Sequence, residues 1–287
     1  MGMDDSQQVT AAAEQAGRPQ QSAALRWALM ALVGLLAGFL SGLFGIGGGS
    51  IIVPALVWAG LSQRQAAATS LAAIVPASVS GLVSYAMSGR VDWLAAILMA
   101  CGSIVGSQLG AWLLSRMSEL FLRWAWAAFL ACVVVSQFVF IPSRDSSIHM
   151  TWLTGLCLLA IGLLIGTLSG LLGVGGGAVA VPALSLLFDA SDLIARGTSL
   201  LAMFPGAITG TIANAKRGLV HLTTGLVVGL LAALAAPLGS ICANHLSARL
   251  GSILLALYLA AILLRCIWSA LSITPGLAAS LGGLHRR

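Results

Sequence analysis

The chain has 287 residues, of which 59% are hydrophobic and only 8% are charged, and its formal net charge is +6. Soluble domains carry roughly a quarter charged residues, so this composition excludes a globular fold with a water-covered surface. The basic residues are scattered singly through short connections, which argues against nucleic-acid binding and fits the cytoplasmic loops of a membrane protein. We therefore expect the lipid bilayer as the surrounding medium.

The chain begins with a polar segment, residues 1–24, that is rich in Gln, Ala and Ser. It lacks the positive start and the immediate apolar run of a signal peptide, which predicts a disordered tail. Ten apolar stretches follow, at 25–46, 50–60, 66–88, 93–114, 120–141, 151–174, 178–188, 197–214, 219–242 and 249–271. Eight of them reach the ~20 residues that a helix needs to cross the hydrocarbon core, and two are too short. The sequence predicts an all-α integral membrane protein with about eight full transmembrane helices and two half-helices broken by glycine.

The two halves of the chain share one sequence motif. Residues 38–56 read GFLSGLFGIGGGSIIVPAL and residues 166–184 read GTLSGLLGVGGGAVAVPAL, with 13 of the 19 positions identical. Duplication of this kind is a construction principle of secondary transporters, which bind their substrate between the repeats. It predicts two homologous membrane repeats over 25–141 and 151–271, a connecting loop at 142–150 and a C-terminal tail at 272–287.

The relative orientation of the repeats depends on the two short stretches. If each of them crosses the membrane, the repeats are inverted, and if each is re-entrant, the repeats are parallel. The distribution of basic residues leans to inversion, because Lys and Arg are retained in cytoplasmic connections. Both arrangements place the two termini in the cytoplasm, and we expect a multi-pass protein of the plasma (inner) membrane.

The strongest functional signal is the glycine triplet at each short stretch. The candidate binding residues are Gly47, Gly48, Gly49 and Ser50 in the first repeat and Gly175, Gly176 and Gly177 in the second. Consecutive glycines break a helix, and the helix that follows would aim unpaired N–H groups and its positive dipole end into the gap. That geometry binds anions. The alternative is that the glycines only allow helices to pack closely. A nucleotide-binding loop is disfavoured, since neither triplet is followed by Lys-Ser or Lys-Thr.

Polar side chains at corresponding positions extend the candidate site. The hydroxyl groups belong to Thr69, Ser70, Thr198 and Ser199. Either they donate to an oxyanion, or they cap and connect helices. Asn214, which aligns with Tyr85, is a further candidate for the ligand shell, as are Ser41 and Ser169.

The ionisable residues argue against several functional classes. The acidic residues all fall in the tail or in connections, and they are Asp4, Asp5, Glu14, Asp92, Glu119, Asp145, Asp189 and Asp192. A proton relay or a cation site usually places a carboxylate at membrane depth, so cation transport is disfavoured. Arg265 is expected to be the only charge within a spanning stretch, near its end, where it snorkels. The sequence shows neither a metal-spaced histidine cluster nor a Ser/His/Asp set, so we expect no enzyme activity, cofactor or metal.

At these residues the chain resembles the sulfite exporter TauE/SafE family of membrane permeases. The resemblance rests on the duplicated motif at 38–54 and 166–182 and on Thr-Ser-Leu at 69–71 and 198–200, and it extends over roughly 25–271. It implies a permease for a small sulfur-containing anion such as sulfite, thiosulfate or an organosulfonate. One departure is Ala178 in the place of Ser50, which makes the two half-sites unequal.

We therefore expect a secondary transporter that carries a small anionic substrate through a site between the two repeats, with one repeat rocking against the other. An anion channel would use similar backbone groups without a conformational cycle. A non-transporting membrane scaffold or assembly protein would need the glycines only for folding. The sequence is compatible with a homo-oligomer.

Overall fold

The structure, a computed structural model, describes residues 23–139 and 150–271. The expected tails at 1–24 and 272–287 and the expected loop at 142–150 lie outside the described residues, apart from a few residues at their edges. Within the described residues the chain forms helices and no strand, so the all-α prediction is confirmed.

The described residues form ten helices, eight of them long and two short. They are α2 (Ala23–Phe44), α3 (Gly49–Trp58), α4 (Gln63–Met87), α5 (Trp93–Arg116), α6 (Glu119–Val139), α7 (Trp152–Leu172), α8 (Gly177–Leu187), α9 (Asp192–Ala215), α10 (Leu222–His245) and α11 (Ala248–Leu271). Five contain apolar spans long enough to cross a membrane, namely α2, α4, α5, α7 and α10. The membrane crossings expected at α6, α9 and α11 stay predictions.

Helix boundaries follow local capping chemistry. Ser62 starts α4 with a capping box, in which its side chain accepts from the N–H of Gln65 and the Gln65 side chain accepts from the N–H of Ser62. Asp92 and Ser191 cap α5 and α9 through their side-chain oxygens. The cap at Ser191 starts α9 five residues before the apolar stretch that begins at residue 197, so the helix includes two charged residues.

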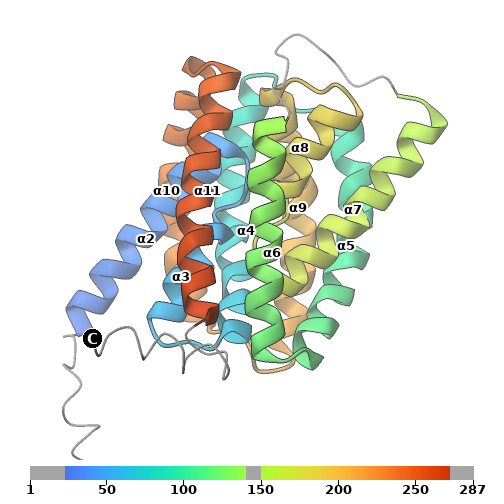
Figure 1. Ribbon diagram of the computed structural model, residues 1–287. Coiled ribbons are helices and arrows are strands. Elements are labelled where there is room, and N and C mark those ends of the chain that lie inside the picture. Colours follow the sequence, from blue (N-terminus) through green and yellow to red (C-terminus); the bar gives the residue numbers. More distant parts are fainter. Residues whose placement is uncertain (1–22, 140–149, 272–287) are drawn as a thin grey trace, which may run out of the picture.

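The two short helices return toward the end of the molecule from which the preceding helix came. In Figure 1, α2 rises from the lower end and α3 returns to it, whereas α7 starts at the upper end and α8 returns to it. The helices α4 and α9 that follow run antiparallel, since Gly81 of α4 faces Leu200 of α9 and Leu71 of α4 faces Gly210 of α9. Each short helix is therefore the second arm of a hairpin, and the two hairpins enter from opposite ends.

Two helix pairs approach so closely that only glycine fits between their backbones. On α2, a Cβ atom at Gly34 would lie 2.7 Å from the carbonyl oxygen of Val228 on α10. On α5, a Cβ atom at Gly102 would overlap the backbone of α7, and one at Gly166 of α7 would overlap the backbone of α5. Small residues permit this kind of contact between membrane helices. Because each pair joins a helix of the first half to one of the second, the two halves of the chain are interlocked.

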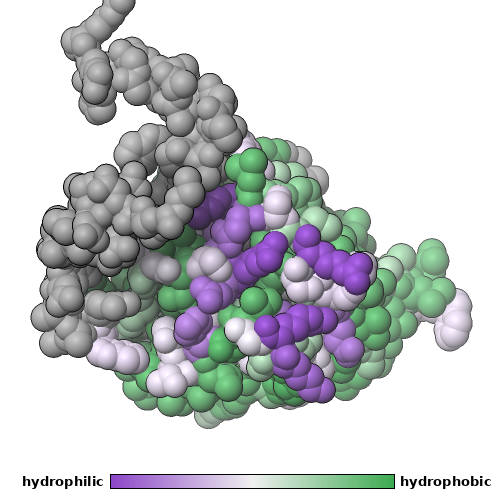
Figure 2. Space-filling view, turned by 90° about the horizontal axis from the view of Figure 1, so that it is seen from below, coloured by the Kyte–Doolittle hydropathy of each residue, from purple (hydrophilic) through white to green (hydrophobic). Residues whose placement is uncertain are grey.

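The outer surface and the lower end differ in character. Large apolar side chains such as Leu35, Val105, Leu164 and Leu234 are exposed on the sides of the bundle, as expected for contact with lipid. Hydrophilic side chains gather on the lower end face (Figure 2). Five basic residues belong to the helix ends that meet there, and they are Arg64, Arg116, Arg123, Lys216 and Arg217.

Candidate functional site

The two glycine motifs adopt the same backbone conformation. The left-handed glycines have φ values of 71° at Gly45, 86° at Gly47 and 74° at Gly48, and of 71° at Gly173, 90° at Gly175 and 81° at Gly176. Residues with a Cβ atom rarely occupy this region, so glycine is the residue that lets the chain turn from α2 into α3 and from α7 into α8. We refer to residues 45–49 as the first glycine loop and to residues 173–177 as the second.

The two loops cross at the centre of the molecule. A Cβ atom at Gly49 would overlap the carbonyl oxygen of Gly173, and one at Gly177 would overlap that of Gly45. Gly48 and Gly176 are the N-caps of α3 and α8, and neither offers a side-chain acceptor. The N-terminal ends of the two short helices therefore meet, backbone against backbone.

The first N–H groups of both short helices have no backbone acceptor among the described residues. These are the N–H groups of Gly49 and Ser50 in α3 and of Gly177 and Ala178 in α8. The N-terminus of a helix carries roughly half a positive charge, so two such ends face each other in an apolar interior. This arrangement favours an anion, which would neutralise both ends and accept their free N–H groups.

Ser70 and Ser199 connect the two loops to opposite halves of the chain. Ser199 of α9 donates to the carbonyl oxygen of Gly45 at 2.8 Å, and Ser70 of α4 donates to that of Gly173 at 2.6 Å. In this conformation each hydroxyl proton is directed at a carbonyl oxygen, so neither serine presents a donor to a ligand. Their role as ligand donors stays a prediction.

Thr69 and Thr198 accept hydrogen bonds from the backbone at the starts of neighbouring helices. The N–H of His221, before α10, donates to the Thr69 hydroxyl oxygen at 3.1 Å, and the N–H of Asp92, before α5, donates to that of Thr198 at 2.9 Å. The two bonds connect α4 to α10 and α9 to α5. In this conformation the threonines thus position helices, the alternative that sequence reasoning left open.

Side chains that the sequence did not single out also hold the loops. Tyr85 donates to the carbonyl oxygen of Gly42 at 2.7 Å, and the Tyr258 hydroxyl lies 3.0 Å from that of Ser50. Trp126 of α6 donates through Nε1 to the carbonyl oxygen of Leu172 at 3.0 Å. The chain contains only two tyrosines, and both bond to residues of the duplicated motif at 38–56, namely Gly42 and Ser50. The rarity of this residue type was a signal that the sequence offered.

A buried ion pair corrects the expectation that acidic residues lie only in the tail and connections. Asp192 is the first residue of α9, and its carboxylate lies 3.2 Å from the Arg196 guanidinium, with both side chains buried. Arg196 also donates to the carbonyl oxygen of Leu43 at 2.6 Å. Arg265 is therefore not the only charge within a long helix, because Arg196 lies in α9 and Arg123 in α6. The i, i+4 spacing of Asp192 and Arg196 behind a Ser cap was the signal that the sequence offered.

Apolar side chains close the centre around the crossing loops. Ile74 of α4 and Met203 of α9, which occupy equivalent positions in the two halves, both pack against Gly47 and Gly175. Ile46 and Val174, within the loops, are also buried. The candidate anion groups are therefore buried in this conformation. Among the described residues, no three His, Cys, Asp or Glu side chains are grouped to hold a metal ion.

Asn214 is a buried amide whose side-chain nitrogen and oxygen both lack a hydrogen-bond partner among the described residues. Leaving such a group unpaired costs about 1–3 kcal/mol. We expect Asn214→Leu to raise the unfolding temperature of the purified protein, because the unpaired amide is removed, and to lower transport, because the ligand contact predicted for Asn214 would be lost. Thermal unfolding followed by protein fluorescence checks the first effect, and flux into proteoliposomes checks the second. A lower unfolding temperature with unchanged transport would contradict the ligand assignment.

Comparisons with known proteins identify the family of the chain. The family model of the sulfite exporter TauE/SafE matches residues 7–137 and 158–284. The chain is 27% identical to the "Probable membrane transporter protein YunE" of Bacillus subtilis over 222 residues, which cover 69% of this chain and 81% of that protein. It is 26% identical to the "Probable membrane transporter protein YdhB" of the same species over 257 residues, covering 88% and 98%.

A plant protein matches over a shorter stretch, and no solved structure matches. The "Sulfite exporter TauE/SafE family protein 6" of Arabidopsis thaliana is 41% identical over 80 residues, which cover 28% of this chain and 18% of that protein. The family match covers both halves and both glycine loops, and several helices have the length and composition of membrane spans. The chain is therefore a multi-pass membrane protein that belongs to the sulfite exporter TauE/SafE family of membrane transporters.

Proposed function

We propose that this protein is a secondary transporter for a small sulfur-containing anion such as sulfite, thiosulfate or an organosulfonate. The anion would bind between two inverted repeats, at the crossing of the two glycine loops. The observation that carries the proposal is the meeting of the N-terminal ends of α3 and α8, whose first N–H groups have no backbone acceptor among the described residues. Discontinuous helices that aim their N-termini at an anionic group are a recurring device of secondary transporters.

The choice of an anion rests on the charges around the crossing. Two positive helix ends repel each other in a medium of low dielectric constant, and a cation there would add to the repulsion. The carboxylate of Asp192 is already paired with Arg196 and therefore offers no net negative charge. A bound oxyanion would stabilise the crossing by accepting N–H groups from both loops.

Movement between two bodies, each made of closely packed helices from both halves of the chain, would open the site. One body contains α2, α3, α4 and α10, and the other contains α5, α7, α8 and α9. Within each body, backbones touch at glycines and helices share hydrogen bonds, such as Ser80 to Ala233 and Ser103 to Ala202. Between the bodies, α4 and α9 meet through the ends of leucine side chains at Gly81 and Gly210. The bodies are also connected at the glycine loops by the bonds from Ser70 to Gly173 and from Ser199 to Gly45, and these bonds would have to break when the site opens. We therefore assign the rocking motion to these bodies and not to the two halves of the chain.

Orientation and partners follow from the same scheme. The lower end face holds the basic residues Arg64, Arg116, Arg123, Lys216 and Arg217. Such residues are retained on the cytoplasmic side, so both termini would lie in the cytoplasm and the protein in the plasma membrane. The proposed partners are the substrate anion and the bilayer, with self-association into a homo-oligomer left to measurement.

Two other functions make different predictions. An anion channel would conduct without saturation or counterflow. A scaffold or assembly protein would need the glycine loops for folding and would carry no flux. The direct test is uptake of labelled sulfite, and separately of thiosulfate, by proteoliposomes under imposed proton, sodium and potassium gradients. We expect saturable uptake that unlabelled sulfite inside the vesicles accelerates. A folded, reconstituted protein that gives no flux of either anion would overturn the proposed function.

A further inference from the structure

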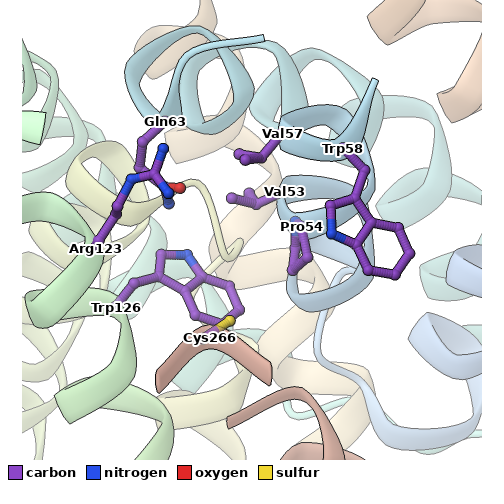
Figure 3. A pocket seen from close by; sticks show the side chains of 8 residues that line it. All are labelled: Val53, Pro54, Val57, Trp58, Gln63, Arg123, Trp126 and Cys266. Atoms are coloured by element: carbon purple, nitrogen blue, oxygen red, sulfur yellow. The ribbon is translucent and has the colours of Figure 1, made fainter. Parts of the chain in front are cut away.

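A pocket at the lower end of the molecule combines one guanidinium group with two tryptophans. It has a volume of about 50 Å³ and lies between α3, α4, α6 and α11. Figure 3 shows Arg123 and Gln63 side by side on one wall, the ring of Trp126 beside them, and Val53, Pro54 and Val57 of α3 across the pocket. This space holds roughly three or four water-sized groups, which is the size of a small oxyanion.

The charge in this pocket is partly withdrawn from water. The Arg123 side chain is only 18% exposed, and Trp126 is buried. A guanidinium in such a setting attracts an anion more strongly than one on an open surface, because its field is screened less. The carboxylate of Glu119 lies 4.0 Å from the Arg123 guanidinium, and it also accepts from the backbone N–H of Gln63 at 3.3 Å. Glu119 therefore weakens the field of Arg123 in part.

The pocket is connected to both glycine loops. Its apolar wall is α3, whose N-terminal end is the first loop, and Trp126 donates to the carbonyl oxygen of Leu172, the residue before the second loop. The second half of the chain has no counterpart, because the positions equivalent to Arg123 and Trp126 are Ser252 and Leu255. Of Arg123 and its equivalent Ser252, only Arg123, near the lower end, carries a positive charge.

We propose that this pocket is a recruiting site for the transported oxyanion, with Arg123 as the group that binds it before it reaches the glycine loops. The proposal rests on the proposed function for the identity of the anion. A phosphate group of an anionic lipid shares the required chemistry. The small volume and the connection to both loops favour the free anion.

Binding and transport measured separately test the proposal. Equilibrium dialysis of radiolabelled thiosulfate against purified protein gives the dissociation constant without any flux. We expect Arg123→Gln to raise it about tenfold, since a charge-assisted contact is lost, and Arg123→Lys to raise it less. Glu119→Gln keeps an acceptor for the Gln63 N–H and removes the opposing charge, so it should lower the constant about twofold. The matched control is Arg116→Gln, because Arg116 lies near the same end, over the Trp112 ring, and outside the pocket.

Reconstitution separates the two sources of the anion and the two proposals. In vesicles of neutral phosphatidylcholine, Arg123→Gln should raise the KM for thiosulfate uptake with little change in maximal flux. A defect that occurs only when phosphatidylglycerol is present, with thiosulfate binding unchanged, would overturn the assignment in favour of a lipid headgroup. If the unmodified protein transports the anion and the Arg123→Gln and Arg116→Gln variants bind thiosulfate equally well, the recruiting site is overturned and the proposed function stands. Arg123-dependent binding of thiosulfate without any flux would confirm an anion site in the pocket and overturn the proposed transport function.

Discussion

Gly48→Val is expected to abolish transport while the protein still inserts and folds. Gly48 is the N-cap of α3 at φ 74°, where a β-branched residue is strongly disfavoured. A Cβ atom there would also lie 2.9 Å from the carbonyl oxygen of Ala37, closer than such atoms normally come. The α3 N-terminus would be displaced from the crossing, and with it the N–H groups proposed to bind the anion. A loss of only 1.4 kcal/mol of binding to the transition state already reduces flux about tenfold.

A glycine in open space supplies the control for this experiment. Gly89, in the turn between α4 and α5, has φ 67° and no atom within 4 Å of the position that a Cβ would take. Gly89→Val carries the same backbone strain without a collision, so it should keep most of the transport. Flux is compared at matched amounts of monodisperse protein, and Gly48→Ala serves if the valine variant fails to fold. Normal flux in a well-folded Gly48→Val protein would contradict the proposed site.

Sequence reasoning located the helices and the loops because their signals are local. The apolar stretches gave all ten helices within a few residues, and the repeated triplet identified both helix breaks. The hairpins are not predicted by the sequence, because a short apolar stretch after a long one fits a crossing or a re-entrant piece equally well. The sequence leaves open how far α2 and α7 penetrate before the chain turns back.

The contacts between distant helices could not be predicted in the same way. Ser70 and Ser199 were identified as polar residues near the site, but their bonds to the loop of the opposite half depend on how α4 and α9 pack. Trp126 lies near the start of an apolar stretch, where tryptophan commonly occurs as a residue of the membrane interface. Its bond to Leu172 arises only because α6 packs against the start of the second loop.

Arg196→Met is expected to lower the stability of the protein more than any other substitution considered. It removes the guanidinium that lies 3.2 Å from the buried carboxylate of Asp192, and breaking a buried ion pair on one side costs about 3–5 kcal/mol. For a chain of this size we expect a fall in unfolding temperature of about 10 °C. Thermal unfolding of the purified protein measures the change. Arg217→Met is the matched control, because Arg217 is exposed just after α9 and its guanidinium donates to the carbonyl oxygen of Ala213 in the last turn of that helix.

The double variant Asp192→Asn with Arg196→Met separates the ion pair from the contact with the first loop. Removing both charges removes the ion pair as a unit, so the double variant should be more stable than Arg196→Met alone. Both Arg196→Met and the double variant should transport less than the unmodified protein. In both of them the donor to the carbonyl oxygen of Leu43 is missing, so the first glycine loop loses the hydrogen bond from Arg196 that connects it to α9. Additive stability losses would contradict the coupling of the pair. Full transport by the double variant would show that the first loop does not depend on Arg196, so that the bond from Ser199 to Gly45 alone suffices to hold it against α9.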